Sequence, residues 1–421
     1  MPYSQVVIKM ARIILSIVGA CLATGGLPEA YSQWHQWGGP NRDFKVASAK
    51  LAEKWPANLL EKKWQRPLGD GYSSIVASGD MLFTMFRQDD LEHLVALDAG
   101  SGKVVWKHSY AVEFREGTDV EEFGPGPLAT PLLLGDRIVG IGVTGMMHCL
   151  DIQSGQVLWK HHVIDEFAGT NLYRGYSASP IGYENLVIVP IGGKKSGLVA
   201  FDQQDGSVAW QGHDFDIAHV SPLLIRFGNQ DQLVIVAHHT VVAVHPDNGE
   251  VLWQVEHPID GGYISSTPVF AEDGRLFFSA AYGNGSRCIQ LRREGDSIRA
   301  QEVWHNQRLR IHHSNSIRIG KYLYGPSGDF SAMLYSCINV ETGELAWQDR
   351  KIGRVAALFA DEKFVMLQED GVLILARMSP AGPTLLSQTK LFDSRAWTVP
   401  TIVGKRIYIR NREEIMAYEL P

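Results

Sequence analysis

The chain has 421 residues, of which 45% are hydrophobic, so it can bury a large core. Its 42 glycines and its 10% content of aromatic residues suit many short strands joined by tight turns. The formal net charge is only −7, with Lys and Arg scattered along the sequence, which argues against a phosphate-binding surface and against nucleic acid as a partner.

Residues 1–30 are predicted to be a targeting signal rather than a part of the fold. Lys9 and Arg12 precede an apolar run from Ile13 to Ala23. This run is too short to cross about 30 Å of hydrocarbon, but it matches the central region of a secretory signal. A short buried helix is the alternative. The signal predicts an exported protein of the periplasm or cell envelope. No other stretch of the sequence is long and apolar enough for a membrane span.

Cysteine usage adds a second interpretation of this segment. Val18-Gly19-Ala20-Cys21 resembles a bacterial lipoprotein signal, in which the cysteine is acylated, so Cys21 is a candidate lipid anchor. The alternative is an ordinary cysteine in an apolar segment.

The other cysteines are Cys149, Cys288 and Cys337. They lie far apart and form no CxxC pair, so we expect neither a disulfide framework nor a metal site.

Residues 31–57 form a leader ahead of the main fold. Trp34 and Trp37 stand beside a turn-forming run, Gly38-Gly39-Pro40-Asn41. We expect this leader to pack on the following domain as a strap or plug.

A turn-and-tryptophan pattern then recurs along the chain. An Asp or a similar residue opens a hairpin turn, a glycine follows, and a tryptophan comes four residues after the glycine. Glycine supplies a positive φ, the Asp carboxylate accepts hydrogen bonds from turn amides, and the indole packs between neighbouring units. The residues of the pattern are Trp64, Asp98, Gly102, Trp106, Asp151, Gly155, Trp159, Asp202, Gly206, Trp210, Gly249, Trp253, Gly343 and Trp347, and Trp304 belongs to a degenerate copy.

The spacing of these tryptophans, between 42 and 53 residues, is typical of propeller blades. Eight segments of small residues, such as Leu128–Pro131 and Ser177–Pro180, each begin a unit. The sequence therefore predicts an all-β fold, an eight-bladed β-propeller with four-stranded antiparallel blades over residues 58–421. Only three strands follow the eighth start, so the strand of Trp64 should complete that blade. Pairing of the N- and C-terminal strands would then close the ring and remove open sheet edges, and we expect a monomer.

The run A-x-D-x-x-x-G-x-x-x-W resembles the tryptophan-docking motif of the pyrroloquinoline-quinone-like (quinoprotein alcohol dehydrogenase-like) propeller superfamily, over roughly residues 60–421. Trp34–Asp43 resembles the leader of exported bacterial members. The resemblance implies one of two functions, because the superfamily contains quinoprotein dehydrogenases and non-catalytic proteins that assemble outer-membrane β-barrels.

The superfamily's enzymes sandwich the quinone between a tryptophan and a disulfide of adjacent cysteines, and they hold calcium with Glu and Asn near a catalytic Asp. This sequence has no adjacent cysteines and no such set of residues. We therefore predict a non-catalytic propeller of the bacterial cell envelope that binds a ligand or an envelope protein, with no cofactor. The alternative is an alcohol or sugar dehydrogenase dependent on pyrroloquinoline quinone (PQQ) and calcium.

The starts of the eight units predict a ligand site. Superposed on their turns, they place large side chains from separate blades at one mouth of the central channel, where a planar or acidic ligand would fit. The predicted ring consists of Tyr72, Arg174, Tyr176, His219, Tyr263, His313, Arg354 and Trp397. The alternative is that these side chains only fill a funnel.

Two further features are predicted to be structural. The doublets His161-His162, His238-His239 and His312-His313 do not chelate a metal by themselves, because adjacent strand residues point to opposite faces. The acidic insertion Glu113–Glu122 is expected to be a solvated loop, long enough to reach over the channel mouth.

Overall fold

The computed structural model describes residues 34–56, 60–113, 123–259, 264–312, 314–329 and 333–421. The chain divides into two units, residues 1–30 and 31–421, and all described residues belong to the second. Cys21 and the predicted signal lie outside the described residues. Among the described residues, no helix has the length and apolar character needed to span a membrane.

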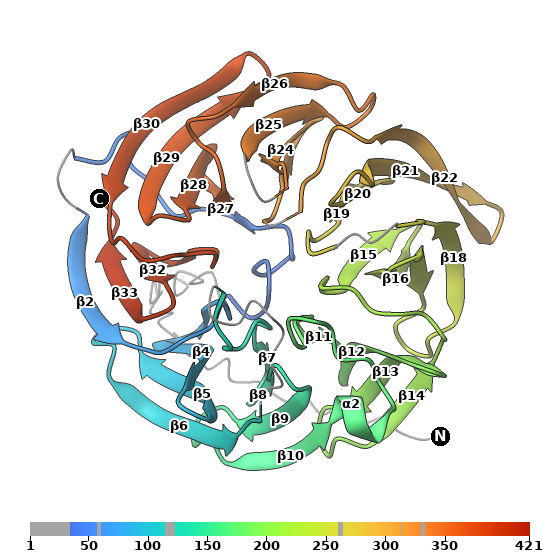
Figure 1. Ribbon diagram of the computed structural model, residues 1–421, viewed down its shortest axis with the longest axis horizontal. Helices are drawn as coiled ribbons and strands as arrows, with labels where there is room; N and C mark the ends of the chain where they lie inside the picture. The colour runs from blue at the N-terminus through green and yellow to red at the C-terminus, as the bar shows by residue number, and fades with distance from the viewer. Residues whose placement is uncertain (1–33, 57–59, 114–122, 260–263, 313, 330–332) are drawn as a thin grey trace, which may run out of the picture. The chain divides into compact units, whose positions relative to one another are not determined.

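Residues 34–421 form eight sheets arranged around a common axis (Figure 1), which confirms the predicted eight-bladed, all-β propeller. Blade 1 comprises β3 (Val76–Ser78), β4 (Met81–Gln88), β5 (Leu91–Asp98) and β6 (Val104–Ala111), and blade 2 comprises β7 (Leu132–Leu134), β8 (Arg137–Ile141), β9 (Met146–Asp151) and β10 (Val157–His162). Blade 3 comprises β11 (Ile181–Tyr183), β12 (Leu186–Gly193), β13 (Ser196–Asp202) and β14 (Val208–Gly212), and blade 4 comprises β15 (Leu223–Phe227), β16 (Gln230–Val236), β17 (Thr240–Val244) and β18 (Val251–Glu256). A short helix, α2 (Val163–Glu166), follows blade 2.

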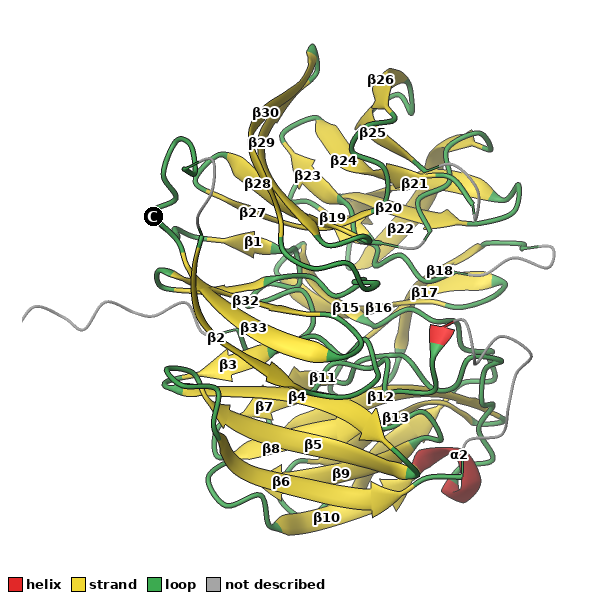
Figure 2. Cartoon of the chain, turned by 60° about the vertical axis from the view of Figure 1, so that its left-hand side comes forward, coloured by secondary structure: helices red, strands yellow, loops and turns green. Residues whose placement is uncertain are grey.

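The second half of the chain continues the same pattern. Blade 5 comprises β19 (Val269–Phe270), β20 (Arg275–Ala280), β21 (Gly285–Glu294) and β22 (Ser297–Asn306), and blade 6 comprises β23 (Ile317–Ile319), β24 (Tyr322–Ser327), β25 (Leu334–Asn339) and β26 (Leu345–Asp349). Blade 7 comprises β27 (Val355–Ala360), β28 (Lys363–Gln368), β29 (Val372–Ser379) and β30 (Gly382–Lys390), and blade 8 comprises β31 (Thr401–Val403), β32 (Arg406–Arg410), β33 (Glu414–Glu419) and β2 (Glu61–Pro67). The hairpin of β29 and β30 projects beyond the neighbouring strands (Figure 2).

The chain termini close the ring as predicted. β2 pairs antiparallel with β33, and Trp64 lies opposite Ala417. The N-terminal strand is thus the outermost strand of the blade that the C-terminus builds, and blade 8 has its full set of four strands.

Each outer-strand tryptophan of the regular repeat packs on the hairpin turn of the next blade. The Trp159 indole Nε1 donates a hydrogen bond to Gln203 O at 3.0 Å, and a Cβ on Gly206 would lie 2.7 Å from the Trp159 ring. The same pair of contacts occurs for Trp64 with Ala99 and Gly102, Trp106 with Ile152 and Gly155, Trp210 with Pro246 and Gly249, and Trp304 with Val340 and Gly343. The recurrent glycine therefore provides room for the indole as well as a positive φ.

Trp253 and Trp347 depart from this pattern. The Trp347 Nε1 donates to Ser379 O of blade 7 at 2.7 Å, but no glycine lies under its ring in the described part of that blade. Trp253 does not reach the next blade with its Nε1. Its Nε1 donates to Gln232 Oε1 in its own blade, at 2.7 Å. Blade 5 has the long β21–β22 hairpin in place of the glycine turn, so the usual acceptor for Trp253 is missing.

The Asp residues of the repeat organise the turns. Asp98 Oδ1 accepts hydrogen bonds from the Ser101 amide and hydroxyl, and Asp151 Oδ1 does the same with Ser154. These bonds hold the pKa of both carboxyls below the usual range, and the bonds from the serine hydroxyls have the largest effect.

Small hydroxyl residues connect the innermost segments of neighbouring blades. The amide of Ser74 donates to Thr130 Oγ1 at 3.1 Å, the amide of Thr130 donates to Ser179 Oγ at 2.9 Å, and the amide of Ser179 donates to Ser221 Oγ at 2.9 Å. The side chains are small because the blades crowd together near the axis.

The leader runs past the innermost strands near the centre of the ring (Figure 1). Trp34 pairs with Ala77 of β3, and His35 O accepts a hydrogen bond from the Leu133 amide of blade 2. The Trp37 Nε1 donates to Thr267 Oγ1 at 2.9 Å, next to blade 5. β1 (Lys45–Val46) then pairs parallel with β27 of blade 7. We refer to residues 34–46 as the strap.

Arg42 anchors the strap at its centre. Its guanidinium is buried and donates to Pro180 O at 2.6 Å, to Pro222 O at 2.7 Å and to Gln36 Oε1 at 2.9 Å. Burial lowers the pKa of this side chain to about 9, so the cation persists at neutral pH. The strap thereby ties the entries of blades 3 and 4 together.

Candidate functional site

Part of the predicted ring converges on Trp397, which precedes blade 8. The Tyr72 ring stacks on this indole with centroids 5.1 Å apart, and the Phe123 ring stacks on it at 5.5 Å. Tyr72 precedes β3, whereas the strap pairs with Ala77 within β3. Burial raises the pKa of Tyr72 to about 12, so its phenol is neutral.

Three guanidinium groups surround these rings. The Cζ of Arg174 lies 3.9 Å from the centroid of Phe123, and the Cζ of Arg395 lies 5.0 Å from that of Trp397. The Cζ of Arg354 lies 5.4 Å from the Trp397 centroid. These distances are those of cation–π contacts. We call Tyr72, Phe123, Arg174, Arg354, Arg395 and Trp397 the aromatic–arginine cluster.

Glu369 contributes a carboxylate to the cluster's surroundings. Glu369 Oε2 accepts hydrogen bonds from Arg354 Nη1 and from the Trp397 Nε1, each at 3.0 Å. It sets the orientation of both side chains, so Arg354 is already paired with an anion of its own chain.

Phe123 reaches the cluster because the residues after it pack closely on blade 1. Gly124 has a φ of +81°, and a Cβ at this position would collide with the paired side chains of Asp70 and Arg412. The amide of Tyr72 donates to Pro127 O at 2.8 Å. Residues 124–127 therefore hold Phe123 in place beside Trp397.

The remaining predicted ring residues are not in this cluster. Tyr176 is fully buried in the core between blades 2 and 3, where its hydroxyl donates to Pro190 O at 2.8 Å and burial raises its pKa. His219 contacts Ser177 Oγ through Nδ1 at 2.7 Å, and burial lowers its pKa to about 4. Tyr263 and His313 lie outside the described residues. Adjacent residues of an extended segment face opposite sides, which is why Tyr176 turns into the core.

Sequence reasoning missed Phe123 and Arg395. Arg395 stands two residues before Trp397, the spacing that places extended residues on one face, and this signal was available. No sequence signal pointed to Phe123, because only the packing of residues 124–127 brings it to the cluster.

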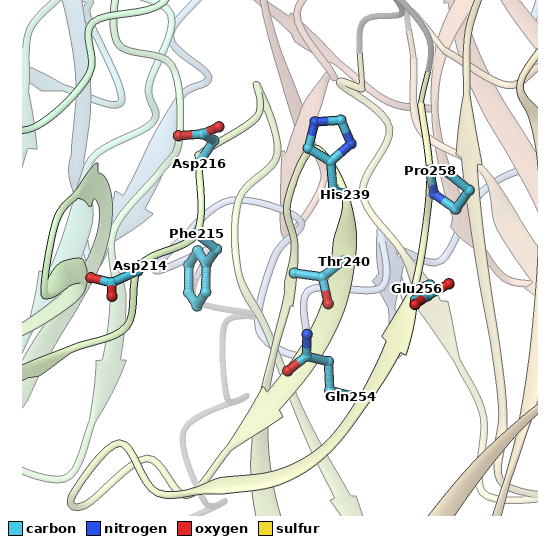
Figure 3. A pocket seen from close by; sticks show the side chains of 8 residues that line it. All are labelled: Asp214, Phe215, Asp216, His239, Thr240, Gln254, Glu256 and Pro258. Carbon is cyan, nitrogen blue, oxygen red and sulfur yellow. The ribbon is translucent and has the colours of Figure 1, made fainter.

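A separate groove of about 500 Å³ opens beside blade 4 (Figure 3). One side is the connection that carries Asp214, Phe215 and Asp216, and the other is the β17–β18 hairpin with the segments next to it. Its lining residues are Asp214, Phe215, Asp216, His239, Thr240, Gln254, Glu256 and Pro258. The lining has three carboxylates and no Lys or Arg, so the groove is acidic.

The His161-His162 doublet has a structural role. His161 bridges blades 2 and 3, with Nε2 2.8 Å from Gly206 O and Nδ1 2.6 Å from Glu166 Oε2. Across the described ranges, no group of three or more His, Cys, Asp or Glu side chains could hold a metal ion.

A family model described as outer membrane protein assembly factor BamB matches residues 90–349. The chain belongs to this family. BamB of Shewanella oneidensis is 20% identical over 374 residues, which cover 85% of this chain and 88% of that protein.

Solved structures share the BamB-type fold. BamB from Moraxella catarrhalis matches with a TM-score of 0.61 at 14% identity, covering 85% of this chain and 99% of that one. A quinohemoprotein alcohol dehydrogenase from Pseudomonas putida matches with a TM-score of 0.66 at 12% identity, covering 92% of this chain and 80% of that one. The family match, together with this shared fold, places the chain in the PQQ-like propeller superfamily, as its repeat predicted.

The residues present do not fit a bound quinone. Tyr72 and Phe123 both stack on Trp397, so this indole already contacts two rings of its own chain. Cys149, Cys288 and Cys337 are free and buried in three different blades, so none can form the adjacent-cysteine disulfide of the superfamily's enzymes.

Proposed function

We propose that this protein is a non-catalytic binding propeller that takes part in protein assembly at the bacterial cell envelope. The match of residues 90–349 to the BamB family carries this proposal. The similarity to BamB of Shewanella oneidensis extends over most of both chains, which supports a shared role for the whole propeller.

The proposal includes the location and the partners of the chain. The N-terminal segment directs export to the periplasm or the cell envelope, where Cys21 is a candidate lipid anchor. The partner is an envelope protein or a small ligand, and the aromatic–arginine cluster is the candidate ligand site. The acidic groove beside blade 4 offers a second surface, suited to a basic partner segment.

The test is deletion of the gene in the native host, followed by measurement of folded β-barrel proteins in the outer membrane by their heat-modifiable electrophoretic mobility. We expect a reduced folded fraction that the wild-type gene restores. An unchanged folded fraction would contradict the proposal.

The rival function, a PQQ-dependent dehydrogenase, is supported by the likeness to the quinohemoprotein fold. Calorimetric titration with PQQ and calcium, followed by a dye-linked dehydrogenase assay, separates the two. Tight binding with turnover of an alcohol or a sugar would establish the rival, whereas we expect neither.

A further inference from the structure

Phe123 occupies a slot with two well-defined walls. The Trp397 ring covers one wall at 5.5 Å with an interplanar angle of 29°, and the Arg174 guanidinium lies over the Phe123 ring at 3.9 Å. Arg395 lies 5.2 Å from the same ring. Stacking on an indole and contact with a guanidinium both favour a flat aromatic side chain.

The surroundings of the slot are cationic. Arg174, Arg354 and Arg395 lie around the rings, and Glu369 pairs with Arg354. The Asp70 carboxylate beside Gly124 is paired with a fourth guanidinium, that of Arg412. In the sequence, Phe123 directly follows Glu121 and Glu122. The side chain that the slot holds thus comes from an acidic stretch of this same chain.

We propose that this slot is a receptor for an aromatic side chain carried by an acidic segment of a partner protein, and that Phe123 occupies it in cis. This inference rests on the proposed binding function and names the chemistry of the ligand. Phe123 belongs to the same chain as the slot, so it competes intramolecularly with any partner side chain. A partner segment must therefore displace Phe123, which makes the wild-type site self-inhibited.

The test uses the full chain with Phe123→Ala and a fluorescently labelled peptide of this chain's own residues 116–123, Glu-Gly-Thr-Asp-Val-Glu-Glu-Phe, blocked at both ends. Fluorescence anisotropy measures binding. We expect Phe123→Ala to bind the peptide at least about tenfold more tightly than the wild type, because the intramolecular competitor is gone.

Three controls identify the chemistry. Adding Arg174→Ala to Phe123→Ala should weaken binding by about tenfold, the usual loss for a charge-assisted contact. Replacing the peptide's carboxylates by amides, or its Phe by Ala, should weaken binding as well. Phe215→Ala, which removes a ring stacked on His213 at 5.5 Å beside the acidic groove, should leave peptide binding at the wild-type level.

Equal affinity of the wild type and Phe123→Ala, or equal binding of the acidic and amide peptides, would overturn the inference and leave Phe123 as structural filling. If Phe123→Ala fails to fold, Phe123→Leu retains the bulk and removes the flat ring, and it must then bind the acidic peptide more tightly than the wild type does. The proposed function is tested independently by outer-membrane assembly. If the peptide does not bind but gene deletion reduces outer-membrane assembly, the receptor inference is rejected and the proposed function stands.

Discussion

The glycine of each regular hairpin turn meets two separate constraints. Gly206 has a φ of +75°, which L side chains rarely adopt, and a Cβ at this position would lie 2.7 Å from the Trp159 ring of the preceding blade. The first constraint is local to the turn. The second exists only because neighbouring blades pack together.

We expect Gly206→Ala to destabilise the protein by about 2 kcal/mol or more, because the left-handed conformation and the crowded indole both oppose a methyl group. Gly212→Ala is the matched control in the same blade, since Gly212 has no positive φ and its Cβ would meet nothing within 4 Å. Thermal unfolding measures both. Equal melting temperatures for the two variants would show that neither the backbone conformation nor the Trp159 contact excludes a methyl group at position 206.

At the scale of the element, the strap is a tie between blades rather than a surface decoration. It contacts blades 1, 2 and 7 through its backbone, and side chains at its centre contact the entries of blades 3, 4 and 5. Beyond it, the amides of Ala49 and Leu51 donate to Asp361 Oδ2, so the leader continues down blade 7.

Arg42→Met should loosen the strap, because it removes charge-assisted bonds worth roughly 1.5–3 kcal/mol each and leaves Pro180 O and Pro222 O buried without their donor. We expect a lower melting temperature and faster proteolytic cleavage within the leader. Lys45→Ala is the control, because its ion pair with Asp43 is partly exposed and worth under about 1 kcal/mol. Unchanged cleavage in Arg42→Met would mean that the backbone contacts alone hold the strap.

At the scale of the whole molecule, buried histidines distributed around the ring predict sensitivity to acid. Burial lowers the pKa of five of them to about 3 or 4: His93, His148, His219, His257 and His312. Each is neutral in the folded protein, whereas the unfolded chain takes up a proton as the pH falls below about 6.5. The folded state therefore loses stability between about pH 6.5 and pH 4, by up to about 1.4 kcal/mol per pH unit for each histidine.

The melting temperature should fall steeply from pH 7 to pH 4.5, and His257→Leu should reduce that fall. His257 is fully buried against Phe278, and neither of its ring nitrogens has a hydrogen-bond partner within the described part of the chain. Phe278→Leu, which alters the same contact without removing a titratable group, is the control and should leave the pH dependence unchanged. A melting temperature that stays constant from pH 7 to pH 4.5 would contradict the argument.

Several features of this protein follow from the sequence alone, because they are local and repeated. The spacing of the tryptophans predicted the blade length, and the Asp and Gly positions predicted the turns. The count of strand starts predicted that Trp64 lies in a strand completing the last blade, and β2 and β33 do pair. Each of these inferences depends on residues close together in the chain, where pattern and backbone geometry correspond directly.

The composition of the aromatic–arginine cluster was decided only by the tertiary structure. Trp397 and Tyr72 come from opposite ends of the chain and meet through closure of the ring. Tyr176 shared the predicted ring but faces the core, and Phe123 entered the cluster because Gly124 packs against Asp70. Arg42 gave no sign in the sequence that its partners are the carbonyls of Pro180 and Pro222. Repeats determine the blade. A site made from several blade entries depends on which way each side chain turns, and that is set by packing between blades.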